Sequence, residues 1–105
     1  MADFLNPPVL QDVDLSGYTG KSGEPIRIQA FDDIAVSAVD VALTHLEGTV
    51  LEQGSATFDE RALLWTYLTQ AAAVPGETLV VHVTAADRPG NTVTKAFHHA
   101  VALPA

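Results

Sequence analysis

Apolar residues occupy every second position along several short segments of this chain, most clearly over residues 39–43 and 79–85. A period of two places alternate side chains on opposite faces of a β-strand, so it indicates strands with one buried face. Turn-forming residues such as Pro75-Gly76 interrupt the chain at short intervals and leave little room for helices. The sequence therefore predicts an all-β fold.

Seven segments carry this strand signal: Val9–Leu15, Pro25–Phe31, Val36–Leu46, Val50–Thr57, Leu63–Thr69, Thr78–Asp87 and Thr92–Ala102. The segment 58–73 contains alanine-rich stretches that permit a helix, but Trp65, Thr66 and Tyr67 favour a strand there. Seven short strands in about 100 residues suit an immunoglobulin-like sandwich of two antiparallel sheets. We expect a tail or linker over residues 1–7 and a single domain over residues 8–105, with a glycine-rich loop at 17–23.

Composition excludes several classes of partner. The formal charge is -8 and the five lysines and arginines are scattered along the chain, so nucleic acid is a poor partner. No apolar run approaches the roughly 20 residues that a membrane-spanning helix requires, so membrane insertion is not expected. The absence of cysteine excludes disulfides and thiolate metal sites. The first residues lack the features of a signal peptide, which leaves the cellular location unknown.

Several motifs together resemble bacterial immunoglobulin-like (Big-type) domains. In the C-terminal half they are Trp65-Thr66-Tyr67, the turn Pro75-Gly76-Glu77, and 81–91 with its A-x-D-x-x-G-N hairpin. In the N-terminal half they are 23–30, Asp32-Asp33 and the spaced valines of 36–41. The resemblance covers roughly residues 8–101. It implies an extracellular or cell-surface module for spacing, adhesion or carbohydrate association, provided that the chain belongs to a longer exported protein.

A calcium site is the first candidate for a metal. Asp32 and Asp33 follow one predicted strand, and Asp87 and Asn91 flank a hairpin at the same end of an immunoglobulin-like sandwich. Converging carboxylate and amide oxygens suit Ca²⁺, which takes six to eight hard ligands. The alternative is that each aspartate caps its own turn. We therefore expect no cofactor, with Ca²⁺ as the candidate to test.

A histidine site is the second candidate. If Asp87 pairs with Asn91 across the hairpin, His82 faces Ala96 and lies diagonal to His98 on one sheet face. The strand that contains Asp40 would then bring this carboxylate beside His82, which allows a His-His-Asp zinc site. Surface histidines without a metal are the simpler interpretation.

The aromatic pair Trp65 and Tyr67 shares one face of its strand. Directed outward, the two rings would form a platform for a sugar or a protein; directed inward, they would fill the space between the sheets. The burial preference of tryptophan favours the core.

A weakly charged face completes the candidates. The positions that point away from the core on three strands include Asp40, His82, Ala96 and His98 and are otherwise rich in alanine and threonine. Such a face can dock a protein partner, a neighbouring domain or, weakly, a second copy of the chain.

No residue set predicts catalysis. No serine lies in a G-x-S-x-G context, and the G-K-S at Gly20-Lys21-Ser22 lacks the earlier glycine and the helix of a phosphate loop. The sequence therefore predicts a non-catalytic interaction or spacer module. The alternative is a calcium-dependent or carbohydrate-binding module.

Overall fold

The computed structural model describes residues 9–31, 36–87 and 91–101, which form strands and connecting loops without a helix. Within these residues no helix is long and apolar enough to span a bilayer. The strands are β1 (Val9–Asp14), β2 (Pro25–Phe31), β3 (Val36–His45), β4 (Val50–Ser55), β5 (Thr57–Asp59), β6 (Leu64–Leu68), β7 (Thr78–Asp87) and β8 (Thr92–Ala100).

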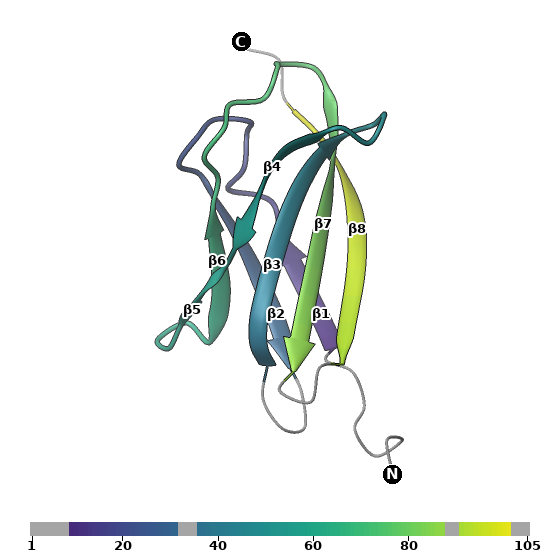
Figure 1. The fold of residues 1–105 in the computed structure, drawn as a ribbon. Helices are drawn as coiled ribbons and strands as arrows, with labels where there is room; N and C mark the ends of the chain where they lie inside the picture. The colour runs from purple at the N-terminus through teal and green to yellow at the C-terminus, as the bar shows by residue number, and fades with distance from the viewer. Residues whose placement is uncertain (1–8, 32–35, 88–90, 102–105) are drawn as a thin grey trace.

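The strands form two antiparallel sheets that face each other (Figure 1). One sheet has the order β1-β2-β6-β5 and the other the order β4-β3-β7-β8. In immunoglobulin notation these orders correspond to A-B-E-D and C′-C-F-G. The prediction of an all-β, antiparallel two-sheet sandwich is therefore confirmed.

The core follows the alternation of the sequence. The inward positions of the central strands β3 and β7 are completely or almost completely buried, and those of β2 pack against them from the opposite sheet. These buried aliphatic residues are Ile26, Ile28, Val39, Val41, Leu43, Leu79, Val81 and Val83, which we call the aliphatic centre. Burial of one such side chain contributes about 1.5–3 kcal/mol, so this layer makes a large favourable contribution to folding.

The predicted strand Val50–Thr57 is wrong in one respect, because it divides at Ala56 into two strands of different sheets. β4 pairs with β3, whereas β5 pairs with β6. The amide of buried Ala56 donates to the carbonyl of Val39 at 2.7 Å, which fixes the crossing point. Alternation continues through the crossing, so the pattern alone does not reveal the change of sheet. The described residues consequently form eight strands, and the helix allowed for 58–73 does not form.

One end of the sandwich is held by carboxylates, and we call it the polar end. It comprises the loop 15–24 and the segment 69–77. Glu24 accepts hydrogen bonds from the amides of Thr19 and Lys21 at 2.8 and 2.9 Å, which orders the predicted glycine-rich loop. The Thr19 hydroxyl also donates to the Glu24 carboxylate at 2.7 Å, and this side-chain hydrogen bond is the main reason that the pKa of Glu24 is lowered. The Thr69 hydroxyl connects this loop to β6 by donating to the carbonyl of Glu24 at 2.9 Å.

Two further features complete the polar end. The ring of buried Tyr18 lies 5.3 Å from that of His99, and the Tyr18 hydroxyl is buried without a hydrogen-bond partner among the described residues. Burial raises the pKa of Tyr18 to about 12. Gly20 has a φ of 101°, and a Cβ there would lie 2.5 Å from Cγ1 of Val101. Glycine is therefore required where this loop crosses the end of the chain's last described segment.

The first and last strands place the described chain ends at opposite ends of the sandwich. β1 begins at Val9, which pairs with Phe31 at the end of β2. β7 ends at the same end of the sandwich as β2, and β8 begins beside the end of β7. β8 then runs to the polar end, where Ala100 pairs with Thr78. Figure 1 shows β1 beginning at the bottom and β8 finishing at the top. The chain thus passes through the sandwich from one end to the other.

Candidate interaction surface

The outward positions of the β4-β3-β7-β8 sheet form one continuous face. β7 pairs with β3 on one side and with β8 on the other, so its outward residues align in rows with theirs. The face comprises Val50, Gln53 and Ser55 of β4, Ala38, Asp40, Ala42 and Thr44 of β3, Thr78, Val80, His82, Thr84 and Ala86 of β7, and Thr92, Thr94, Ala96, His98 and Ala100 of β8. We call it the alanine–threonine face.

This face differs from the rest of the molecule in charge and in the size of its side chains. Among the described residues, Asp40 is the only acidic one on this face, and no described lysine or arginine lies on it. Five of its residues are alanines, so small side chains cover much of the sheet surface. Its composition agrees with the weakly charged face expected from alternation.

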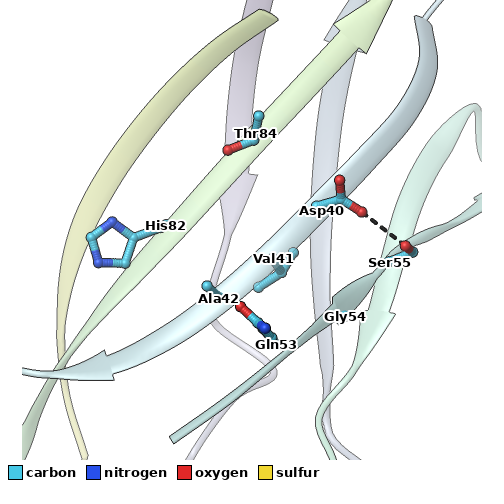
Figure 2. A pocket seen from close by; sticks show the side chains of 8 residues that line it. All are labelled: Asp40, Val41, Ala42, Gln53, Gly54, Ser55, His82 and Thr84. Carbon is cyan, nitrogen blue, oxygen red and sulfur yellow. Dashed lines mark hydrogen bonds between the residues drawn. The ribbon is translucent and has the colours of Figure 1, made fainter. Parts of the chain in front are cut away.

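A shallow concavity of about 580 Å³ lies on this face, mainly over β3 and β4 (Figure 2). Its lining residues are Asp40, Val41, Ala42, Gln53, Gly54, Ser55, His82 and Thr84. Gly54 lies in the floor of the concavity, and a Cβ at this position would point inward, only 3.0 Å from Cε1 of Tyr67 in the opposite sheet. The Tyr67 ring therefore packs directly beneath the floor.

The polar groups of the face bond to one another across the strands. Asp40 accepts a hydrogen bond from the Ser55 hydroxyl at 2.8 Å, and Nε2 of His82 lies 3.1 Å from Oγ1 of Thr44. The hydroxyls of Thr84 and Thr94 are 2.9 Å apart. These bonds hold the side chains in place on the sheet, which favours a preformed surface for docking.

The structure does not assemble the predicted His-His-Asp zinc site. His82 pairs with Ala96 and lies diagonal to His98, as the hairpin register predicted. On the other side His82 pairs with Ala42, while Asp40 pairs with Thr84. Figure 2 shows Asp40 directed toward Ser55 and His82 directed away from it. No group of three or more His, Asp or Glu among the described residues is arranged to hold a metal.

The calcium candidates divide between described and undescribed residues. Asp87 is 3% exposed, and its Oδ1 accepts a hydrogen bond from the amide of Asn91 at 2.8 Å. The amide of Asp87 donates to the carbonyl of Asn91 at 3.0 Å. These two residues therefore bond to each other across their own hairpin. Asp32 and Asp33 lie outside the described residues.

The two aromatic candidates differ in burial: Tyr67 lies in the core, whereas Trp65 is only partly buried. Tyr67 is 2% exposed and donates a hydrogen bond of 2.5 Å from its hydroxyl to Glu52, and burial raises its pKa well above the usual value. Trp65 is half-buried, with its ring 5.3 Å from that of Phe58 on the paired strand β5. Phe58 is 42% exposed and was not among the predicted site residues. Tyr67 is thus unavailable for a platform, and Phe58 and Trp65 form the aromatic pair that remains near the surface.

The free edges of the sheets are protected against strand addition. The edge strands β8 and β4 carry Lys95 and Glu52 at positions whose side chains turn toward the interior side of the sheet. Lys95 reaches the carbonyl of Leu10 on β1 at 3.4 Å. β1 is interrupted by a register shift between Leu10 and Asp12, and β5 has only three residues. Inward charges, bulges and short strands discourage the pairing of a further strand at these edges.

Comparison with known proteins shows likeness in fold. No family model and no curated protein matches the sequence. CopC from Methylosinus trichosporium OB3b has a TM-score of 0.64 at 14% identity, covering 91% of this chain and 94% of its own. A DUF4426 family protein from Pseudomonas aeruginosa PAO1 has a TM-score of 0.59 at 19% identity, covering 90% and 88%. The chain is thus a small β-sandwich module whose fold resembles these two proteins.

Proposed function

We propose that this chain is a non-catalytic interaction or spacer module of a larger exported or cell-surface protein. The observation that carries the proposal is the path of the chain, which runs from Val9 at one end of the sandwich to Val101 at the other. A module with this path can be joined to neighbours in line, without either connection crossing a face of the sandwich. The expected relation to bacterial immunoglobulin-like domains agrees with this arrangement.

The protected edges and the alanine–threonine face add support. Partners that bind by strand addition are disfavoured, whereas a broad, weakly charged face is left for docking. The polar side chains on this face bond to their neighbours, and its concavity is shallow. A surface of this kind suits a protein partner or a neighbouring domain.

A replacement experiment in the parent gene tests the spacer proposal. Exchange of the module for an unrelated immunoglobulin-like domain of equal length should preserve the activity of the parent protein, whereas deletion should reduce it. Purified module should also show the same thermal unfolding with Ca²⁺ and with EDTA. Loss of activity on exchange, together with a Ca²⁺-dependent rise in the unfolding temperature, would identify a ligand-binding module instead.

One observation favours a second candidate, a carbohydrate-binding module. Phe58 and Trp65 place two aromatic rings together near the surface, and aromatic faces are suited to stacking on sugar rings. Trp65 is the only tryptophan of the chain, so its fluorescence reports directly on this position. Titration with a panel of soluble glycans should leave the fluorescence of a spacer unchanged. A saturable change that is lost in Phe58→Ala would establish glycan binding.

A further inference from the structure

We propose that the alanine–threonine face binds a second copy of the same chain, forming a weak two-fold dimer in which the two β4-β3-β7-β8 sheets stack face to face. This inference rests on the proposed function and specifies one partner for the interaction module. Three properties of the face support it: its charge relative to the rest of the molecule, its area, and the positions of Asp40 and His98.

Charge selects this face for contact between copies. Each chain has a formal charge of -8, so two copies repel each other in most orientations. Of the acidic residues that the structure describes, Asp40 alone lies on the alanine–threonine face, so apposition of two such faces brings few of these acidic groups together. Contact through any more acidic surface would bury like charges, which is unfavourable.

The shape and area of the face agree with a weak dimer. Small side chains allow two sheets to approach at about 10 Å, the usual separation of stacked sheets. Four strands of up to ten residues cover roughly 600 Å², so a dimer would bury about 1,200 Å² in total. This area lies at the lower limit for stable interfaces, and the dimer should dissociate on dilution.

The two ends of one diagonal carry complementary side chains. Asp40 aligns with Thr84 on one side of β7, and His98 aligns with Val80 on the other side, so that His82 lies midway between them. A two-fold axis that lies between the two sheets, passes above His82 and runs perpendicular to the line from Asp40 to His98 would bring these two positions of the two copies opposite each other. Each Asp40 would then face the partner's His98, giving two equivalent hydrogen-bonded pairs, as an isologous interface requires.

Sedimentation of the purified chain over a range of concentrations tests the dimer. We expect a reversible monomer–dimer equilibrium that is weakened at least ten-fold by Ala96→Glu. Ala96 is exposed at the centre of the face beside His82, so the variant should keep its fold. Gln29→Glu is the matched control: it adds the same charge at an exposed position of β2 in the other sheet, and should leave the equilibrium unchanged.

A charge exchange tests the orientation. Asp40→Lys and His98→Asp should each weaken dimerisation, and the double variant should restore it because each lysine then faces an aspartate of the other copy. A chain that stays monomeric at all concentrations, or a dimer insensitive to Ala96→Glu, would overturn the proposal. Either result would leave the spacer function standing, because that function is tested separately by domain exchange.

Discussion

The aliphatic centre and the polar end of the sandwich are stabilised by different interactions. In the centre, β-branched and leucine side chains from both sheets exclude water, and their packing requires volume and periodicity more than direction. At the polar end, single carboxylates accept several directed hydrogen bonds from loop amides. The centre therefore determines that two sheets form, whereas the polar end determines the paths of the loops that connect them.

Glu52 of β4 connects its strand to the polar end through several hydrogen bonds. Its carboxylate accepts hydrogen bonds from the hydroxyl of Tyr67 and from the amides of Gln70 and Ala71, so one side chain connects β4 to β6 and to the following loop. Removal of an aliphatic group leaves a cavity, whereas removal of this acceptor leaves several polar groups without partners. Substitutions of Leu43 and Glu52 separate the cost of a cavity from the cost of unpaired polar groups.

The largest effect is expected in the aliphatic centre. Leu43→Ala should lower the free energy of unfolding by about 2–5 kcal/mol, because Leu43 is 0% exposed and its removal leaves a cavity. Leu46→Ala is the control, since Leu46 lies three residues further and is 64% exposed. Urea denaturation measures both. Similar values for the two variants would show that the centre is not packed as described.

The next largest effect is expected at Glu52. Glu52→Gln keeps the size of the side chain but removes the charge and one acceptor, and should destabilise the fold by about 1–3 kcal/mol. Glu47→Gln makes the same change at an exposed position of the β3–β4 hairpin and should change stability little. Hydrogen exchange should show faster opening of the amides of Gln70 and Ala71 in the first variant alone. Unchanged exchange there would contradict the role given to Glu52.

The two tyrosines should respond in opposite directions. Tyr67→Phe removes a hydroxyl that bonds to Glu52 and should destabilise by about 1 kcal/mol. Tyr18→Phe removes a buried hydroxyl that has no partner among the described residues, and should be neutral or slightly stabilising. Thermal unfolding of the two variants under identical conditions provides the comparison. Clear destabilisation by Tyr18→Phe would reveal a hydrogen bond to that hydroxyl.

The smallest effect is expected on acidification. Hydrogen bonds to Thr19 and His45 lower the pKa values of Glu24 and Glu77 below 4.5 in the folded state. A lowered carboxyl pKa contributes stability above the unfolded value, and this contribution is lost as the pH falls through the folded value. Stability should therefore decline below about pH 4.5, less steeply in Glu24→Gln. An identical acid limb in this variant would exclude Glu24 as a contributor.

The sequence predicted the aliphatic centre well because its signal is local. Alternation identified the buried faces of β3 and β7, and the hairpin after Asp87 placed His82 opposite Ala96 as observed. Each of these features follows from residues that are adjacent or joined by one short turn. The sequence also predicted the weakly charged outer face, because the positions that alternate with the buried ones point to the outside of the same sheet.

The polar end and the strand crossing were not predictable in this way. Glu52 contacts residues 15 to 19 positions away, and nothing in its own neighbourhood distinguishes it from an exposed glutamate. The crossing at Ala56 depends on the carbonyl of Val39, which lies in a strand of the other half of the chain. The sequence predicted Asp40 beside His82, whereas in the structure Asp40 pairs with Thr84, two residues further along β7. Non-local register determined each of these outcomes.

The opposite positions of Val9 and Val101 have a mechanical consequence. A tensile load applied between these residues would run along β1 and β8, parallel to the strands and across their ladder hydrogen bonds. In this shear geometry many hydrogen bonds between strands must break together, whereas a load at one end of a hairpin would break them one after another. The Lys95 contact with the carbonyl of Leu10 further couples the two loaded strands. We therefore expect the sandwich to resist a load applied along its length more strongly than a load that opens one hairpin.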